Sequence, residues 1–195
     1  MIDRALVFLR DELKSHLSGR LTAGAAESLV LTSVLDSDGR LAIPSDSIGM
    51  TVVHLEEERI LRDQGPMYRR DESGSLRKEN PEVRLMLDLL FCANYRSYSE
   101  AWRSLSLVLS FFQSRNVFEP STYPALDAGI EKLVVEHRSL SFEEQNHLWS
   151  VLGANLLPFA LYRTGVVPVR EEQVLGLVRP VETIVVDAGD MGSTS

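Results

Sequence analysis

The chain has 195 residues, of which 44% are hydrophobic and 25% charged, and its formal net charge is −8. This length suits one domain that buries about 70% of the surface exposed by the unfolded chain. A single cysteine, Cys92, excludes an internal disulfide and cysteine-rich zinc motifs. The acidic balance argues against nucleic acid as a partner, because phosphate binding needs a basic face.

Apolar residues at helical spacing open the chain and predict a first helix that ends at Gly19; they are Ile2, Leu6, Leu9, Leu13 and Leu17. The N-terminus lacks the features of a signal peptide. The longest apolar stretch, Val151 to Tyr162, is interrupted by polar residues, glycine and proline, and is shorter than the roughly 18–20 residues that span a bilayer. We therefore expect synthesis in the cytoplasm and no insertion into a membrane.

The next segments predict strands. Ser28–Leu35 reads as a strand, and the turn residues at 36–39 are typical of a hairpin; a second extended run covers Met50–Glu57. From Arg62 to Asn80, glycine, proline and charged residues predict a long polar loop within the domain, at about 62–80. Strict alternation from Val83 predicts a strand that enters the middle of the sheet, since both of its faces turn apolar after Asp88.

A helix is predicted from Ser97 or Ser99, with a stripe formed by Trp102, Leu105, Leu109 and Phe112. Three further apolar residues, Leu107, Val108 and Phe111, widen this stripe almost around the helix. Such a helix either lies in the centre of the core or is covered by another subunit. Trp102 and Trp149 are predicted as core anchors because both occupy helical stripe positions.

The last elements complete an α+β fold. Ile130–Arg138 and Pro158–Val169 are predicted as strands, and a capping box at Ser141–Glu144 opens a helix that stops at Gly153. One more strand is predicted at Thr183–Val186. Helices packed on a single mixed or mainly antiparallel sheet follow from this order, with one domain at 1–169 and a partly disordered extension at 170–195.

No constellation of residues predicts catalysis. Phosphate-binding loops, a nucleophile elbow and a complete zinc-deaminase motif are all missing. His54, Glu56 and Glu58 project from one face of a strand and are either a chelating group or, as we favour, the solvated face of an edge strand. Cys92 lies in the most apolar strand and is predicted to be buried and inert. We expect no enzyme, no cofactor and no metal.

Five stretches, taken in their order and spacing, resemble the cap, or tail-terminator, family of phage-tail-like contractile injection systems. This family is typified by the Photorhabdus virulence cassette and the antifeeding prophage. The resemblance covers roughly residues 1–168 and fades after Val169, and it departs from the family pattern at Asn155-Leu156. The five stretches are His54–Arg59, Asn80–Tyr95, Tyr98–Phe118, Ile130–Leu133 and Leu140–Tyr162.

The resemblance implies a phage tail-terminator-like fold and a non-enzymatic structural role. It implies a homo-hexameric ring that closes the inner tube and the sheath at the end distal to the baseplate, in a particle that stays in the cytoplasm or is released. The alternative is an assembly adaptor or chaperone for a tube or sheath subunit. The residues predicted to form protein interfaces are Arg69, Arg70, Arg77, His54, Glu56, Glu58, Leu107 and Phe111.

Overall fold

The computed structural model describes residues 1–18, 20, 29–58, 67–70, 76–79, 84–168 and 177–178. The chain divides into two compact units. The first combines Met1–Ile60 with Val83–Val169, and the second combines Leu61–Glu82 with Arg170–Ser195. Each unit has a sheet of its own.

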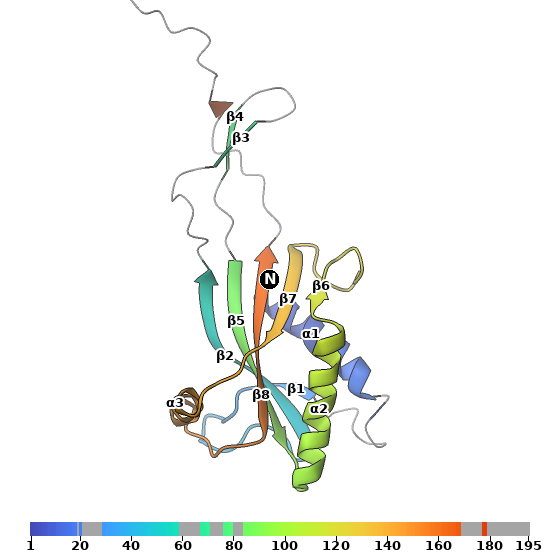
Figure 1. The fold of residues 1–195 in the computed structure, drawn as a ribbon, viewed down its shortest axis with the longest axis vertical. Coiled ribbons are helices and arrows are strands. Elements are labelled where there is room, and N and C mark those ends of the chain that lie inside the picture. Colours follow the sequence, from blue (N-terminus) through green and yellow to red (C-terminus); the bar gives the residue numbers. More distant parts are fainter. Residues whose placement is uncertain are drawn as a thin grey trace, which may run out of the picture. The chain divides into compact units, whose positions relative to one another are not determined.

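A mixed six-stranded sheet forms the centre of the first unit (Figure 1). Its spatial order is β1-β2-β5-β8-β7-β6, and only β1 and β2 run parallel to each other. The predicted α+β class with a mixed, mainly antiparallel sheet is therefore confirmed. The strands are β1 (Leu29–Leu31), β2 (Ser47–Glu58), β5 (Arg84–Asn94), β6 (Val117–Phe118), β7 (Ile130–His137) and β8 (Phe159–Pro168).

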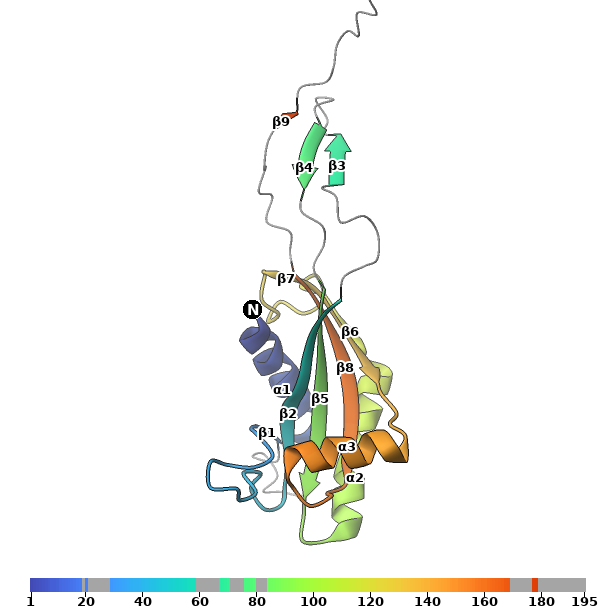
Figure 2. The same ribbon diagram turned by 90° about the vertical axis from the view of Figure 1, so that its left-hand side faces the viewer.

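Strand β5 separates two cores, because its side chains alternate between the two faces of the sheet. Leu87, Leu89 and Phe91 point to the face covered by α1 (Ile2–Ser18) and α2 (Tyr98–Ser114), which we call the two-helix face. Leu90 and Cys92 point to the opposite face, which α3 (Phe142–Leu152) covers and which we call the α3 face. Figure 2 displays α3 crossing in front of the strands, with α1 and α2 behind them. The alternation predicted for this strand, and its place inside the sheet, are confirmed.

The core of the two-helix face is rich in aromatic rings. Phe112 of α2 packs against Phe91 and Tyr162, with ring centroids 5.6 and 4.7 Å away, and these two rings also meet each other at 5.7 Å. The predicted stripe of α1 faces the same core, where Leu9, Leu13 and Leu17 are almost completely buried. Edge-to-face and tilted rings of this kind add to the area that they bury.

Local signals position α3. Ser141 Oγ accepts the backbone N–H of Glu144 at 3.2 Å, and the Glu144 carboxylate accepts the N–H of Ser141 at 2.8 Å, so the predicted capping box is present. The helix ends at Gly153, whose φ of 66° is the left-handed conformation that glycine adopts without strain. Trp149 is buried against Phe159, as predicted.

The prediction of a hairpin after the strand at Ser28–Leu35 is wrong for the pairing of the strands, because β1 and β2 are parallel. The turn after β1 does close, through a bridge between Leu35 and Leu41, and the Asp36 carboxylate accepts the backbone N–H groups of Asp38 and Arg40. A second reversal at Pro44–Ser47 then turns the chain again. Two reversals make β2 parallel to β1, with Leu29 beside Ile48, and β1 is only three residues long.

The predicted stripe of α2 is right for Leu105 and Phe112, which are buried, and wrong for Trp102 and Leu109. Its buried side consists of Ala101, Ser104, Leu105, Val108, Phe111 and Phe112. Trp102, predicted as a core anchor, is 44% exposed, and Leu109 lies on the same outward side. Apolar residues occur almost all round this helix, so packing against β5 and β8 decides which of them is buried.

The second unit contains a three-stranded antiparallel sheet of order β3-β4-β9. Its strands are β3 (Met67–Arg70), β4 (Leu76–Glu79) and β9 (Leu177–Val178). The prediction of a long loop at 62–80 is wrong for the eight residues of β3 and β4. The strand predicted at Thr183–Val186 and the disorder predicted for most of 170–195 lie outside the described residues.

Candidate functional site

A buried carboxylate organises the part of the α3 face that α3 does not cover. Asp88 of β5 is 3% exposed. Its Oδ1 atom lies 3.2 Å from Nε of Arg163 on β8, and its other oxygen accepts a hydrogen bond from Arg138, which follows β7. Because a buried unpaired charge is costly, the two guanidinium groups make this position tolerable for a carboxylate.

The two arginines extend the network outward. Arg163 Nη2 lies 3.0 Å from Glu56 Oε1 on β2, and Arg138 Nη2 lies 3.8 Å from Glu144 Oε1 on α3. The network therefore joins β2, β5, β8 and the first turn of α3. Each charged group of the network lies within 4 Å of an opposite charge, so the network acts as a clamp between elements.

The structure places His54 and Glu56 beside this network. His54 is exposed and Glu56 half-buried, with 3.4 Å between His54 Nε2 and Glu56 Oε2, and His54 stands opposite Asp88 after a bulge at Val53. Glu58 pairs in register with Arg84. Strand β1 lies beside β2 only at Ile48–Met50; among the described residues no strand pairs with the outer edge of β2 from Thr51 onward. Beyond Met50, β2 is therefore an edge strand within the described residues, and the role of His54, Glu56 and Glu58 stays a prediction.

The predicted interface residues of α2 are not both at the surface. Phe111 is completely buried among the aromatic rings of the core, so it offers no surface to a partner, and Leu107 is half-buried. The exposed apolar residues of this helix are instead Tyr98, Trp102 and Leu109.

The second unit brings basic residues together. In the register of β3 and β4, Arg69 lies directly opposite Arg77, and Tyr68 lies opposite Lys78. Arg70 pairs with Leu76 in the same register. The three arginines predicted to form an interface therefore all belong to the ladder of β3 and β4.

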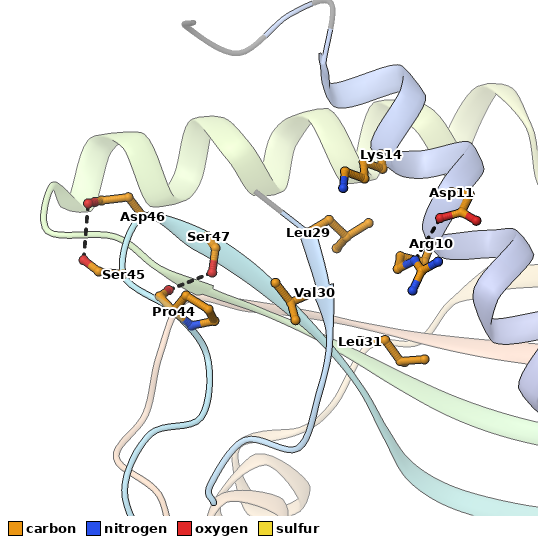
Figure 3. A pocket seen from close by; sticks show the side chains of 10 residues that line it. All are labelled: Arg10, Asp11, Lys14, Leu29, Val30, Leu31, Pro44, Ser45, Asp46 and Ser47. Atoms are coloured by element: carbon orange, nitrogen blue, oxygen red, sulfur yellow. Dashed lines mark hydrogen bonds and ion pairs between the residues drawn. The ribbon is translucent and has the colours of Figure 1, made fainter. Parts of the chain in front are cut away.

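A hollow of about 610 Å³ lies between α1, β1 and the turn before β2 (Figure 3). Arg10 and Lys14 border it on the helix side, and Asp46 on the side of the turn. Arg10 Nε already pairs with Asp11 at 2.8 Å, and Asp46 accepts a hydrogen bond from Ser45. The hollow contains none of the predicted interface residues.

The described residues offer neither a metal-binding group, nor a membrane-spanning helix, nor a reactive thiol. Within the described ranges, no group of three His, Cys, Asp or Glu residues is arranged to hold a metal ion. No helix in the described part of the chain combines the length and apolar character needed to cross a bilayer. Cys92 is completely buried, and burial raises the pKa of its thiol to about 12, so it carries no thiolate at neutral pH.

The clamp around Asp88 was missed by the sequence analysis. Its members are 50 and 75 residues apart along the chain, and no local spacing connects them. One signal was present: Asp88 is the single charged residue between Leu85 and Ala93. A charge inside such an apolar strand needs a partner from another element.

Two solved structures share this fold. The PVC sheath/tube terminator of an extracellular contractile injection system, in its extended state, matches with a TM-score of 0.54 and 16% identity over 97% of this chain and 65% of that chain. The cap of the anti-feeding prophage, a tube-terminating cap, matches with a TM-score of 0.54 and 13% identity over 92% of this chain and 60% of that chain. The chain thus has the fold of the terminators of contractile injection systems, and it spans less than two thirds of the length of these two proteins.

A comparison of the sequence with protein-family profiles identifies the family of this chain. The profile of the Pvc16 N-terminal domain matches residues 6–183. The chain therefore belongs to the Pvc16 N-terminal domain family, which confirms the resemblance to terminators. No protein of curated function matches the sequence significantly.

Proposed function

We propose that this protein is a structural terminator that closes the distal end of the inner tube and sheath of a phage-tail-like contractile injection particle. The observation that carries the proposal is the agreement of two comparisons. A family profile covers residues 6–183, and a fold shared with a sheath/tube terminator and a tube-terminating cap extends over nearly the whole chain. The ionic network around the buried Asp88 pairs each of its charges with an opposite charge of the same unit, which suits a structural role.

The proposed partners are further copies of this chain in a ring of six, the inner tube protein and the sheath protein. A terminator must match the symmetry of the tube that it ends, and identical head-to-tail contacts close into a ring when the rotation between subunits allows it. Nucleic acid and membranes are not among the proposed partners.

The outer edge of β2 is the proposed contact for a sheath segment. Beyond Met50 this edge faces no strand of the described chain, and an extended peptide could add to it through main-chain hydrogen bonds. Adding sheath subunits should slow hydrogen exchange at the outward amides of Val52–Glu57. Exchange that stays unchanged there, while the complex forms, would contradict this contact.

Deletion of the gene tests the proposed function. Without the protein, particles should lose the density that closes the distal end of the tube and should vary widely in tube or sheath length. Particles that contain the protein should carry it in a fixed ratio to the tube end. Closed particles of normal length after deletion would contradict the proposal, and a protein that is needed for assembly but absent from mature particles would favour the adaptor.

A further inference from the structure

The outer edge of β1 borders the hollow between β1 and α1. Strand β1 is the last strand on its side of the six-stranded sheet and pairs only with β2 among the described residues. The backbone N–H of Thr32 donates to the carbonyl oxygen of Met50 at 3.1 Å. Because successive residues of a strand direct their main-chain groups to alternate sides, the N–H and C=O of Leu31 point away from β2.

The hollow has the size and lining of a site for an extended segment. Its volume of about 610 Å³ is within the usual range of ligand sites. Val30 and Leu31 are only half-buried beside it, and Arg10 and Lys14 extend from α1 toward β1 (Figure 3). A strand added to β1 here would therefore have one of its faces against α1.

Lys14 is a half-buried cation of the hollow for which the described residues supply no opposite charge within 4 Å. The neighbouring Arg10 already pairs with Asp11 at 2.8 Å. Asp46, across the hollow, is exposed and accepts a hydrogen bond from Ser45. Since an unpaired charge is costly where solvent is partly excluded, the hollow favours an occupant that carries a carboxylate.

The sequence contains a segment with the required properties. Thr183–Val186, which is predicted as a strand and lies outside the described residues, consists entirely of β-branched residues. Glu182 and Asp187 flank it. These two acidic residues belong to opposite faces of an extended segment, so whichever face turns to α1 carries a carboxylate. Its four residues also match the length of β1, which has three.

The acidic flanks favour the edge of β1 over the free edge of β2. That edge carries Glu56 and Glu57, which would repel a second pair of carboxylates. A β-branched run without a pairing partner is also an aggregation hazard, which pairing at a sheet edge removes.

The chain connections favour a segment from a second copy. Every passage of the chain between the two units leaves the six-stranded sheet at the end where Glu58 pairs with Arg84 and β8 stops at Pro168. The hollow borders Ser47, at the other end of β2. At about 3.3 Å per residue, these two ends of β2 are roughly 35 Å apart. A second copy can present its segment to the hollow without spanning this length.

We propose that Thr183–Val186 of one copy pairs with the outer edge of β1 of a second copy, with a flanking carboxylate beside Lys14. Main-chain hydrogen bonds to Leu31 would hold the added strand, as in other cases of strand addition. The segment and the edge are different parts of the chain, so the contact is head-to-tail and closes a ring when the rotation allows it. The inference rests on the proposed function, since it names how copies in a terminator ring are joined.

The experiment mixes two single variants of the full chain with a short bis-maleimide at high protein concentration. The acceptor chain carries Ser45→Cys, an exposed position beside the hollow, and the donor chain carries Ala188→Cys. Cys92 is buried and unreactive. We expect at least ten times more 45–188 dimers than 150–188 dimers in a control with Ser150→Cys as the acceptor. Ser150 is an exposed serine of α3, on the opposite face of the sheet.

Further variants separate strand pairing from general attraction between charges. In the donor chain, Ile184→Pro with Val185→Pro removes two successive main-chain donors and should reduce the yield to that of the control. Ile184→Val with Val185→Ile keeps both donors and the β-branched character, so it should leave the yield unchanged. In the acceptor chain, Lys14→Glu should reduce the yield at least threefold, and Glu182→Lys with Asp187→Lys in the donor chain should restore it.

A 45–188 yield no higher than that of the control would overturn the proposal. So would efficient 45–188 linkage within single chains of the double variant at high dilution, because each copy would then fill its own hollow. Unchanged unfolding midpoints check that the variants fold. In the unmodified chain, hydrogen exchange at the Leu31 amide should slow as the protein concentration rises, and a rate independent of concentration would also count against the contact.

The contact and the proposed function can fail separately. If the 45–188 link forms but deletion of the gene leaves closed particles of normal length, the contact stands and the terminator role fails. If the deletion leaves open particles but the link does not form, the contact alone is wrong.

Discussion

Asp88 of β5 and Arg163 of β8 lie directly opposite each other in the sheet, with 3.2 Å between Oδ1 and Nε. Arg138 approaches the other oxygen of the same carboxylate, so two cations from different elements converge on one buried anion. The side chains of Arg138 and Arg163 are each about one third exposed, at 34% and 33%, whereas that of Asp88 is only 4% exposed. The clamp is therefore buried on its anionic side and hydrated on its cationic side.

Asp88→Ala should lower the free energy of unfolding by about 2–3 kcal/mol. Removing one partner of a fully buried ion pair costs about 3–5 kcal/mol, and the partial hydration of both arginines reduces this loss. Urea unfolding checks the value. The matched control is Glu136→Ala, because Glu136 also lies opposite Arg163 in register but is exposed. That control should change stability by less than about 0.5 kcal/mol, and equal effects of the two variants would mean that burial of Asp88 is unimportant.

Replacement by valine should change the free energy of unfolding in opposite directions at two buried threonines, Thr164 and Thr51. Thr164 Oγ1 is buried and has no hydrogen-bond partner among the described residues, whereas Thr51 Oγ1 donates to the carbonyl oxygen of Thr32 at 2.6 Å. Thr164→Val removes an unsatisfied polar group at nearly constant volume and should raise the free energy of unfolding by about 1 kcal/mol. Thr51→Val should lower it by about 1 kcal/mol, because it leaves the carbonyl oxygen without its donor.

Urea unfolding measures both changes through the midpoint of the transition. An m-value equal to that of the wild type shows that the variant changes stability and leaves the surface exposed on unfolding unchanged. A loss of stability in Thr164→Val as large as that in Thr51→Val would indicate that the Thr164 hydroxyl has a partner after all.

The sequence predicted those elements whose structure is determined by residues close together in the chain. The alternation of β5 predicted a strand with two covered faces, and the Ser141–Glu144 pattern predicted the start of α3. The phase of α2 was not predictable, because apolar residues occur on almost every side of it and the strands beneath decide which are buried. This is why Trp102 was assigned to the core and Phe111 to a surface.

Features that depend on distant segments were missed. The parallel pairing of Leu29 with Ile48 follows from two successive reversals, which no local period indicates. The clamp around Asp88 joins residues from β5, β8 and the segment after β7. The strands β3 and β4 are four residues each within a polar, glycine-containing segment, so their apolar content was too small to stand out.

The capping box makes part of the stability depend on pH. The backbone N–H of Ser141 and then its side chain bind the Glu144 carboxylate and lower its pKa from the ordinary value of 4.5. A group with a lowered pKa in the folded state stabilises the fold above the unfolded pKa, and the contribution is lost as the pH falls through the folded pKa. Glu144→Gln should therefore reduce the loss of stability between neutral pH and the acid range below 4.5.

Glu143→Gln is the control for this prediction, because it leaves both capping hydrogen bonds in place. Thermal unfolding of the wild type and both variants across this pH range provides the measurement. Ser141→Ala should cost about 1 kcal/mol at neutral pH, as is typical for the loss of an N-cap side chain. Identical pH profiles for the wild type and Glu144→Gln would contradict the assigned role of the capping carboxylate.

The basic residues of the β3-β4-β9 sheet should bind an acidic surface of the tube or sheath protein. The strands β3 and β4 carry Arg69, Arg70, Arg77 and Lys78 in an otherwise acidic chain, and an acidic partner would be attracted to this local positive charge. Replacing Arg69, Arg70 and Arg77 together by alanine should lower the fraction of particle ends that carry the protein, more strongly at higher salt, because salt screens the attraction that remains.

The control for this triple variant removes the same charge from exposed arginines of the first unit, namely Arg40, Arg96 and Arg115. It should leave occupancy close to that of the wild type, since general electrostatic attraction alone would make the two triple variants equivalent. Occupancy is counted on purified particles by electron microscopy at two ionic strengths. If both variants and the wild type occupy the same fraction of particle ends at each ionic strength, the β3-β4-β9 sheet is not part of the binding surface. The edge of β2 then stays as the proposed contact.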